Sequence, residues 1–189
     1  MSKKDIQTER LLRYFLESTK NIIKSEGVDA LTVRSIADNA GYSFGTLYKY
    51  FKDIKELVTQ SGLEFIAECE EYVLENTPES TNPSDRIKFK SGKYIEYFVQ
   101  YSGIYNLLFL SGKKSIGDIK NYNHALLKMH QNVFGTEFGS IFGDKSREML
   151  DLFINIINGG LLLYNNRLYP ETFSEFRQRI NFQIEFLLK

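Results

Sequence analysis

The stretch that decides the fold runs from Thr32 to Phe51 and reads TVRSIADNAGYSFGTLYKYF. Its first part is amphipathic, and Thr32 can cap a short helix that stops at Gly41. Its second part starts at Ser43, another good N-cap residue, and directs Leu47 and Phe51 inward. Two short helices joined by a tight turn at a glycine form a helix-turn-helix.

In a helix-turn-helix the second helix lies in the major groove of DNA, and its N-terminal residues meet the base edges. Because Leu47 and Phe51 point inward, the remaining positions form the candidate DNA-facing surface. These positions are Ser43, Phe44, Gly45, Thr46, Tyr48, Lys49 and Tyr50. Two short helices with a glycine turn also occur in helical proteins that bind no DNA, so the geometry alone leaves both interpretations open.

The flanking sequence supplies a helix on each side of this stretch. Apolar residues repeat at intervals of three and four from Leu12 to Ile23 and stop at Gly27. After the stretch, Asp53 predicts the N-cap of a longer helix, with Glu56 closing a capping box. The N-terminal part is therefore expected to be a three-helix head followed by a long helix.

With these flanks in place, the chain resembles the TetR family of one-component transcriptional regulators. The matching residues cover about positions 10–58. They are Gly27, T-V-R-S-I-A at 32–37, A-G at 40–41, S-F-G-T-L-Y at 43–48, and the K-Y-F-K-D…K-E-L run at 49–57. Beyond them only chain length and helix order resemble the family.

The resemblance implies that Thr32 and Tyr48 bind phosphates. It also implies that Ser43, Thr46, Lys49 and Tyr50 face the groove. One departure concerns Ile54, where the family commonly has a lysine that meets the DNA backbone. In this chain Lys52 or Lys55 must supply that contact, unless backbone N–H groups at the start of the next helix do so.

The rest of the chain predicts an all-α protein, since only three prolines interrupt helical spacing. We expect helices at about 84–101, 105–110, 116–134, 145–167 and 170–188, and a linker at 76–85. The glycines at 135, 139 and 143 leave the stretch 134–144 ambiguous. The expected domains are a DNA-binding domain at 1–55 and a helical domain for ligand binding and dimerisation at 56–189.

Composition excludes several protein classes. The chain has 189 residues, 42% hydrophobic and 14% aromatic, which is too apolar for a disordered protein. A single cysteine excludes an intramolecular disulfide, and no apolar stretch is long enough for a membrane span. The start lacks the apolar core of a signal peptide, so a cytoplasmic location without membrane contact is expected. The 24 basic and 24 acidic residues balance, so DNA contact must depend on local positive charge.

No catalytic, metal or cofactor site is expected. His124 and His130 are six residues apart and do not form the i, i+4 pair of a helical metal site. Cys69 lies on an apolar stripe without an adjacent histidine. The glycines at 135, 139 and 143 lack the strand that a dinucleotide-binding turn requires.

A dense aromatic run suggests a pocket for a flat, largely apolar effector, although such runs also form plain cores. Asparagines on a later helix could add amide contacts. The candidate ligand residues are Tyr94, Tyr97, Phe98, Tyr101, Tyr105, Phe109 and Tyr122, with Asn155 and Asn158.

The last two long helices carry apolar residues on more than one face, which predicts that one face meets a second copy of the chain. In this interpretation Gly159 and Gly160 permit close approach, and Phe182 and Phe186 remain for the partner. A buried central helix in a monomer is the alternative.

The leading hypothesis is a homodimeric repressor that binds double-stranded DNA and is released by a small molecule. One alternative is a constitutive DNA-binding protein that a protein partner regulates. A helical-bundle enzyme or carrier is the alternative from another class.

Overall fold

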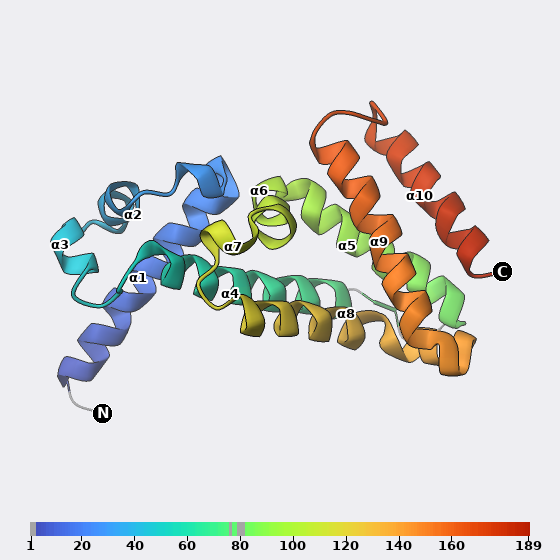
Figure 1. Cartoon of the computed structure of the whole chain (residues 1–189), viewed down its shortest axis with the longest axis horizontal. Coiled ribbons are helices and arrows are strands. Elements are labelled where there is room, and N and C mark those ends of the chain that lie inside the picture. Colours follow the sequence, from blue (N-terminus) through green and yellow to red (C-terminus); the bar gives the residue numbers. More distant parts are fainter. Residues whose placement is uncertain (1–2, 76, 79–81) are drawn as a thin grey trace. The chain divides into compact units, whose positions relative to one another are not determined.

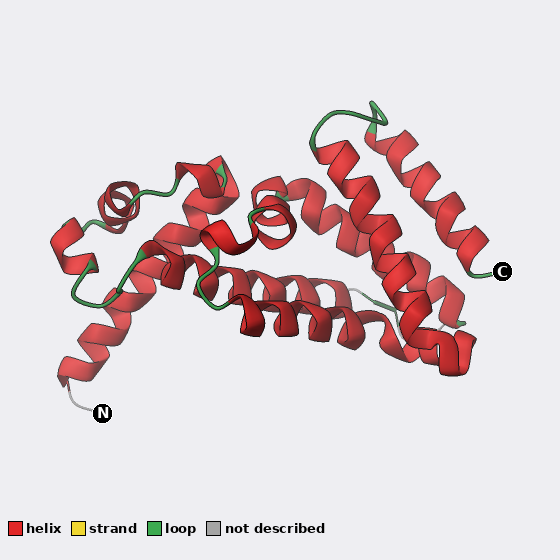
Figure 2. Cartoon of the chain, in the orientation of Figure 1, coloured by secondary structure: helices red, strands yellow, loops and turns green. Residues whose placement is uncertain are grey.

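The computed structural model describes residues 3–75, 77–78 and 82–189, and every regular element in these ranges is helical (Figures 1 and 2). The all-α prediction is confirmed. The chain divides into two compact units. The first contains the residues through Ile66 together with Tyr101–Ala125, and the second contains Ala67–Gln100 and Leu126–Lys189.

The elements follow in chain order. They are α1 Lys3–Glu26, the 3₁₀ turn η1 Val28–Ala30, α2 Val33–Ala40, α3 Phe44–Leu47, α4 Ile54–Glu75, α5 Pro83–Gln100, α6 Ser102–Tyr105, the π-helical turn η2 Asn106–Leu110, α7 Gly112–Ser115, α8 Ile119–Phe142, the 3₁₀ turn η3 Gly143–Lys145, α9 Ser146–Asn165 and α10 Phe173–Leu187.

The first unit is built around a core that joins α1, α2, α3 and the start of α4. Its fully or almost fully buried members are Phe15, Leu16, Ile22, Ile36, Ala37, Leu47, Phe51 and Leu57. Between α1 and α4, the buried amine of Lys20 and the exposed guanidinium of Arg13 each contact Glu64 at 2.8 Å. The shared core packs α2 and α3 against α1 and the start of α4, and the ion pairs join the two long helices to each other.

The segment α6 packs directly on the C-terminal end of α1 in the same unit. A Cβ atom on Gly103 would overlap the carbonyl oxygen of Ile23 and lie 3.4 Å from the Cα of Gly27. Only a glycine fits between these backbones. The expected helix at 105–110 is in fact the π-helical turn η2, which directly follows α6. A π-helix is a rare form for which the sequence carries no periodic signature.

The second unit contains a buried ion-pair cluster. The amine of Lys90 lies 2.9 Å from both carboxylate oxygens of Glu137, and Nε of Arg86 lies 2.9 Å from one of them. Burial alone would raise the pKa of Glu137, but the hydrogen bonds from Lys90 and Arg86 lower it below its usual value. Glu137 is therefore held charged in the interior.

Helix α8 extends beyond the expected end at residue 134 and includes most of the ambiguous stretch. Phe134 and Phe138 are fully buried, and the centres of their rings lie 4.9 and 5.0 Å from that of Phe153 on α9. This packing outweighs the low helix propensity of Gly135 and Gly139. The helix ends before Gly143, whose φ of 53° suits a glycine.

Helices α9 and α10 pack on each other through Gly160. A Cβ there would lie 2.5 Å from Cδ1 of Ile180 and 3.0 Å from Cε2 of Phe176. The expectation that Gly160 makes room for a second copy is thus wrong, because the chain's own α10 fills that space. At Gly159, in contrast, a Cβ would have no neighbouring atom within 4 Å.

Candidate nucleic-acid interface and effector residues

The turn between α2 and α3 is fixed by hydrogen bonds that the sequence makes possible. The Oγ1 atom of Thr32 accepts a bond from the N–H of Ser35 at 2.9 Å, which caps α2. At the other end Gly41 has a φ of 76°, and the N–H of Tyr42 donates to the carbonyl of Ala37 at 2.9 Å. This is a Schellman ending, in which the left-handed residue lets the chain reverse into α3.

Ser43 caps α3 as predicted. Its Oγ accepts from the N–H of Thr46 at 3.2 Å, and the two hydroxyl groups lie 2.9 Å apart. Leu47, the last residue of α3, is fully buried, and Phe51 is 3% exposed. Both side chains therefore face inward as expected. The caps and the core together fix the geometry of the helix-turn-helix.

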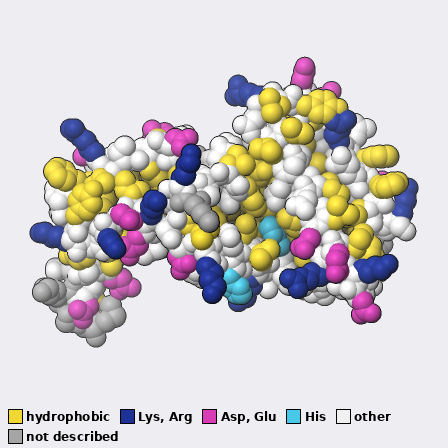
Figure 3. All heavy atoms as spheres, in the orientation of Figure 1, with side chains coloured by type: hydrophobic (Ala, Val, Ile, Leu, Met, Phe, Trp, Pro, Cys, Tyr) yellow, Lys and Arg dark blue, Asp and Glu magenta, His cyan; other side chains and the backbone are white. Residues whose placement is uncertain are grey.

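The structure brings the predicted DNA-facing residues together on one unit. Most are exposed, and Thr46 is half-buried. The three aromatic residues of this set are well exposed for their size: Phe44 is 64%, Tyr48 55% and Tyr50 40% exposed. Figure 3 shows hydrophobic and basic side chains next to one another over this part of the molecule. Such a mixed surface can contact both phosphates and base edges.

The start of α4 differs in one detail from the expected capping box. The N–H of Glu56 donates to Oδ1 of Asp53 at 3.1 Å, as predicted, but the carboxylate of Glu56 accepts from the N–H of Lys52 at 3.2 Å, not from Asp53. Two backbone N–H groups at this helix start are thus already bonded. The side chains of Lys52 and Lys55 are both exposed, and their contact with the DNA backbone stays a prediction.

The candidate ligand residues fall into two groups. Tyr94, Tyr97, Phe98, Asn155 and Asn158 belong to the second unit, and Tyr101, Tyr105, Phe109 and Tyr122 belong to the first.

In the second unit Tyr94 is the centre of a closed network. Its hydroxyl lies 3.1 Å from Nε2 of His130 and 3.4 Å from Oδ1 of Asn158, and its ring centre lies 4.7 Å from that of Phe98. Burial lowers the pKa of His130 to about 4, so this imidazole is neutral near pH 7. The ring of Tyr97 packs on the neighbouring Tyr72, with 5.7 Å between their centres.

The first unit contains four of the aromatic candidates and also buried polar atoms without partners. Burial raises the pKa of Tyr105 to about 12 and also raises that of Tyr122. Three side-chain atoms in the first unit are buried without a hydrogen bond among the described residues: Oγ of Ser61, Oδ1 of Asn106 and the hydroxyl of Tyr122. Sequence reasoning missed Ser61 and Asn106, although a serine between Val58 and Phe65 on an apolar stripe is a visible signal.

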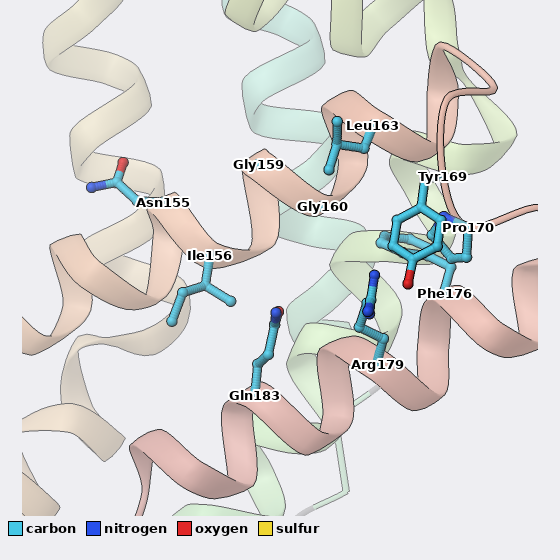
Figure 4. Close-up of a pocket in the computed structure, with 10 residues that line it drawn as sticks. All are labelled: Asn155, Ile156, Gly159, Gly160, Leu163, Tyr169, Pro170, Phe176, Arg179 and Gln183. Atoms are coloured by element: carbon cyan, nitrogen blue, oxygen red, sulfur yellow. The ribbon is translucent and has the colours of Figure 1, made fainter.

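A hollow of about 290 Å³ lies between α9 and α10 (Figure 4). Its border includes Gly159, Leu163 and Gln183, and the guanidinium of Arg179 lies 4.1 Å from the ring centre of Tyr169. Asn155 is exposed at one end of this hollow, so the structure separates it from Asn158, which joins the Tyr94 network.

The described ranges contain no group of three His, Cys, Asp or Glu side chains that could hold a metal ion. In the same ranges no helix is both long and apolar enough to cross a bilayer. Cys69 is fully buried, and this burial raises the pKa of its thiol.

Comparison with known proteins finds one family model that matches the N-terminal part of the chain. Residues 15–60 match the model for bacterial regulatory proteins of the tetR family. No curated protein sequence matches the chain.

Solved structures share the fold over nearly the whole chain. A tetR-family transcriptional regulator from Streptomyces coelicolor has a TM-score of 0.76 at 15% identity, over 95% of this chain and 80% of that one. The transcriptional regulator FadR from Bacillus subtilis, in complex with stearoyl-CoA, has a TM-score of 0.72 at 17% identity, over 94% of this chain and 97% of that one. A transcriptional regulator from Rhodococcus sp. Rha1 has a TM-score of 0.73 at 14% identity, over 95% of each chain. The matched segment 15–60 confirms the resemblance of the N-terminal part to the TetR family, and the solved structures share the fold of nearly the whole chain.

Proposed function

We propose that this protein is a sequence-specific DNA-binding transcriptional repressor that acts in the cytoplasm as a homodimer. The observation that carries the proposal is the capped α2–turn–α3 unit, which lies within the matched residues 15–60 and presents exposed Tyr48 and Lys49. Residues 1–55 would bind DNA, and residues 56–189 would bind the effector and the second copy.

Selection of duplexes from a random pool tests this proposal. We expect a pseudo-palindromic site, since two recognition helices related by a twofold axis meet half-sites one helical turn or a multiple apart. Lys49→Ala should then weaken binding by about 1–3 kcal/mol, with a loss that depends on the base at one position. Tyr48→Phe should weaken binding to all sequences alike, because it removes only a phosphate contact. Recovery of no preferred duplex would refute the proposal.

We further propose that the effector is a small, largely apolar molecule with few polar groups. The support comes from the first unit. It contains four of the aromatic candidates and the unpartnered polar atoms of Ser61, Asn106 and Tyr122. Buried polar atoms without partners are costly, so a ligand that bonds to them would gain affinity. Three basic residues of α5 in the same helical domain are already engaged and so do not favour an anionic effector: Arg86 and Lys90 pair with Glu137, and Lys93 pairs with Glu96.

Thermal-shift screening of apolar compounds tests the effector. A true effector should raise the melting temperature and release the selected duplex, because a ligand shifts DNA affinity only by its preference for the non-binding state. Tyr122→Phe keeps the ring and removes the hydroxyl, so it should weaken the response to a ligand that bonds there. Tyr94→Phe is the matched control in the second unit. If no compound both stabilises the protein and releases DNA, regulation by a protein partner replaces this part of the proposal.

Dimerisation is proposed through α9 and α10. Phe182 is 70% and Phe186 76% exposed on α10, and Leu152 and Leu163 of α9 are 47% and 41% exposed. Exposed apolar side chains in this number on two neighbouring helices are typical of an interface. A twofold arrangement would cover them by the same patch on a second copy.

A further inference from the structure

We propose that Phe44 reads the 5-methyl group of a thymine in the major groove. The inference rests on the DNA binding proposed above and names one base that the binding site must contain. It concerns the side chain of Phe44 alone, at the first position of α3.

No contact within the described part of the protein explains why such a large apolar side chain is exposed at position 44. It is 64% exposed, and its ring contacts no other ring or cation among the described residues. The neighbouring Tyr42 shows the contrast, since its ring centre lies 5.6 Å from that of Phe15 and 6.1 Å from that of Tyr14. Tyr42 thus has a structural role in the head, whereas the ring of Phe44 adds nothing to the core.

The position of Phe44 is nevertheless fixed. Ser43 before it is held by the cap to Thr46, and Leu47 after it is fully buried. The backbone of Phe44 also accepts a hydrogen bond from the N–H of Tyr48 at 3.2 Å. A large apolar side chain is therefore presented at a defined place on the N-terminal end of the helix that meets base edges.

The chemistry of the major groove limits what a phenylalanine can recognise there. Base edges expose hydrogen-bond donors and acceptors, which a phenyl ring cannot satisfy, and one apolar group, the 5-methyl of thymine. The hydroxyls of Ser43 and Thr46 lie 2.9 Å apart and share one hydrogen bond, and neither offers the apolar surface that a methyl group requires. Thymine is the base that fits Phe44.

Uracil substitution in the selected duplex tests the proposal. Deoxyuridine keeps every hydrogen-bonding group of thymine and removes only the methyl. Each thymine is replaced in turn, at both symmetric positions, and binding is measured with wild type, Phe44→Ala and Phe44→Leu. We expect one position at which uracil weakens wild-type binding by about fourfold for each half-site, the value for one buried methyl.

Phe44→Ala should bind thymine and uracil duplexes equally at that position, and Phe44→Leu should retain part of the preference. Lys49→Ala is the control, because it should bind more weakly yet keep the full preference for thymine. Unchanged melting temperatures would show that the variants fold. The proposal is overturned if no thymine is sensitive, or if Phe44→Ala remains as sensitive as wild type. If wild type selects no duplex at all, the DNA-binding proposal itself fails and this one falls with it.

Discussion

Single residues in this protein divide into those that build the fold and those that are left free to act. His130 belongs to the first kind. It is 6% exposed, bonded to the hydroxyl of Tyr94, and its pKa is lowered to about 4 from an ordinary 6.5 by burial. The unfolded chain therefore takes up a proton at this histidine below pH 6.5, while the folded chain stays unprotonated until about pH 4. Stability must fall as the pH decreases through this window.

His130→Gln should reduce this pH dependence. Between about pH 7.5 and pH 5 we expect the free energy of unfolding of wild type to fall by about 2 kcal/mol more than that of the variant, as one shifted group predicts. Urea unfolding at the two pH values measures the difference. His124→Gln is the matched control, because His124 is exposed and its removal should leave the wild-type pH dependence intact. If the free energy of unfolding of the two variants falls by the same amount between the two pH values, the assignment is contradicted.

At the scale of elements, glycines decide how closely helices approach. Gly103→Ala should destabilise the first unit by about 1–3 kcal/mol, because the new Cβ meets the backbone carbonyl of Ile23, which cannot move aside as a side chain could. Gly139→Ala is the matched control in α8. No atom lies within 4 Å of its Cβ position, so the same change should stabilise by about 0.5–1 kcal/mol through helix propensity.

Chemical denaturation of the two variants compares them directly. Opposite signs are expected, and a stabilised Gly103→Ala would contradict the close contact between α6 and α1. The same variant also tests coupling, since a shift of α6 on α1 should change DNA affinity as well as stability. Gly139→Ala should leave DNA affinity unchanged.

These elements also show what the sequence can and cannot predict. Local signals predict the head correctly, because Thr32, Gly41 and Ser43 act on neighbours within a few residues and their caps form as expected. The end of α8 was not predictable locally, since Phe138 extends the helix through contact with Phe153 of another helix. The division of the aromatic run between two units was unpredictable for the same reason. The sequence shows an aromatic run that includes Tyr94 and Tyr122, but it does not show which residues surround them.

At the scale of the whole molecule, the exposed apolar face of α9 and α10 is the surface through which we propose that two copies meet. A monomer would leave Phe182 and Phe186 in water at a cost that burial against a second copy removes. A twofold interface uses the same patch on both chains, so one charge placed there enters the interface twice. Phe182→Asp should therefore convert the dimer to a monomer, as sedimentation at micromolar concentration would reveal.

Leu127→Asp separates this effect from the general effect of a charge on an apolar surface. Leu127 lies on α8 and is 64% exposed, close to the 70% of Phe182, so the two substitutions are alike in chemistry and in starting exposure. Only Phe182→Asp should lose tight binding to the full palindrome while it keeps the weak binding of one head to one half-site. That pattern follows because the two heads of a dimer act at a high effective concentration, whereas a monomer must bind each half-site independently. If both variants stay dimeric and bind the palindrome like wild type, another face of the molecule joins the two copies.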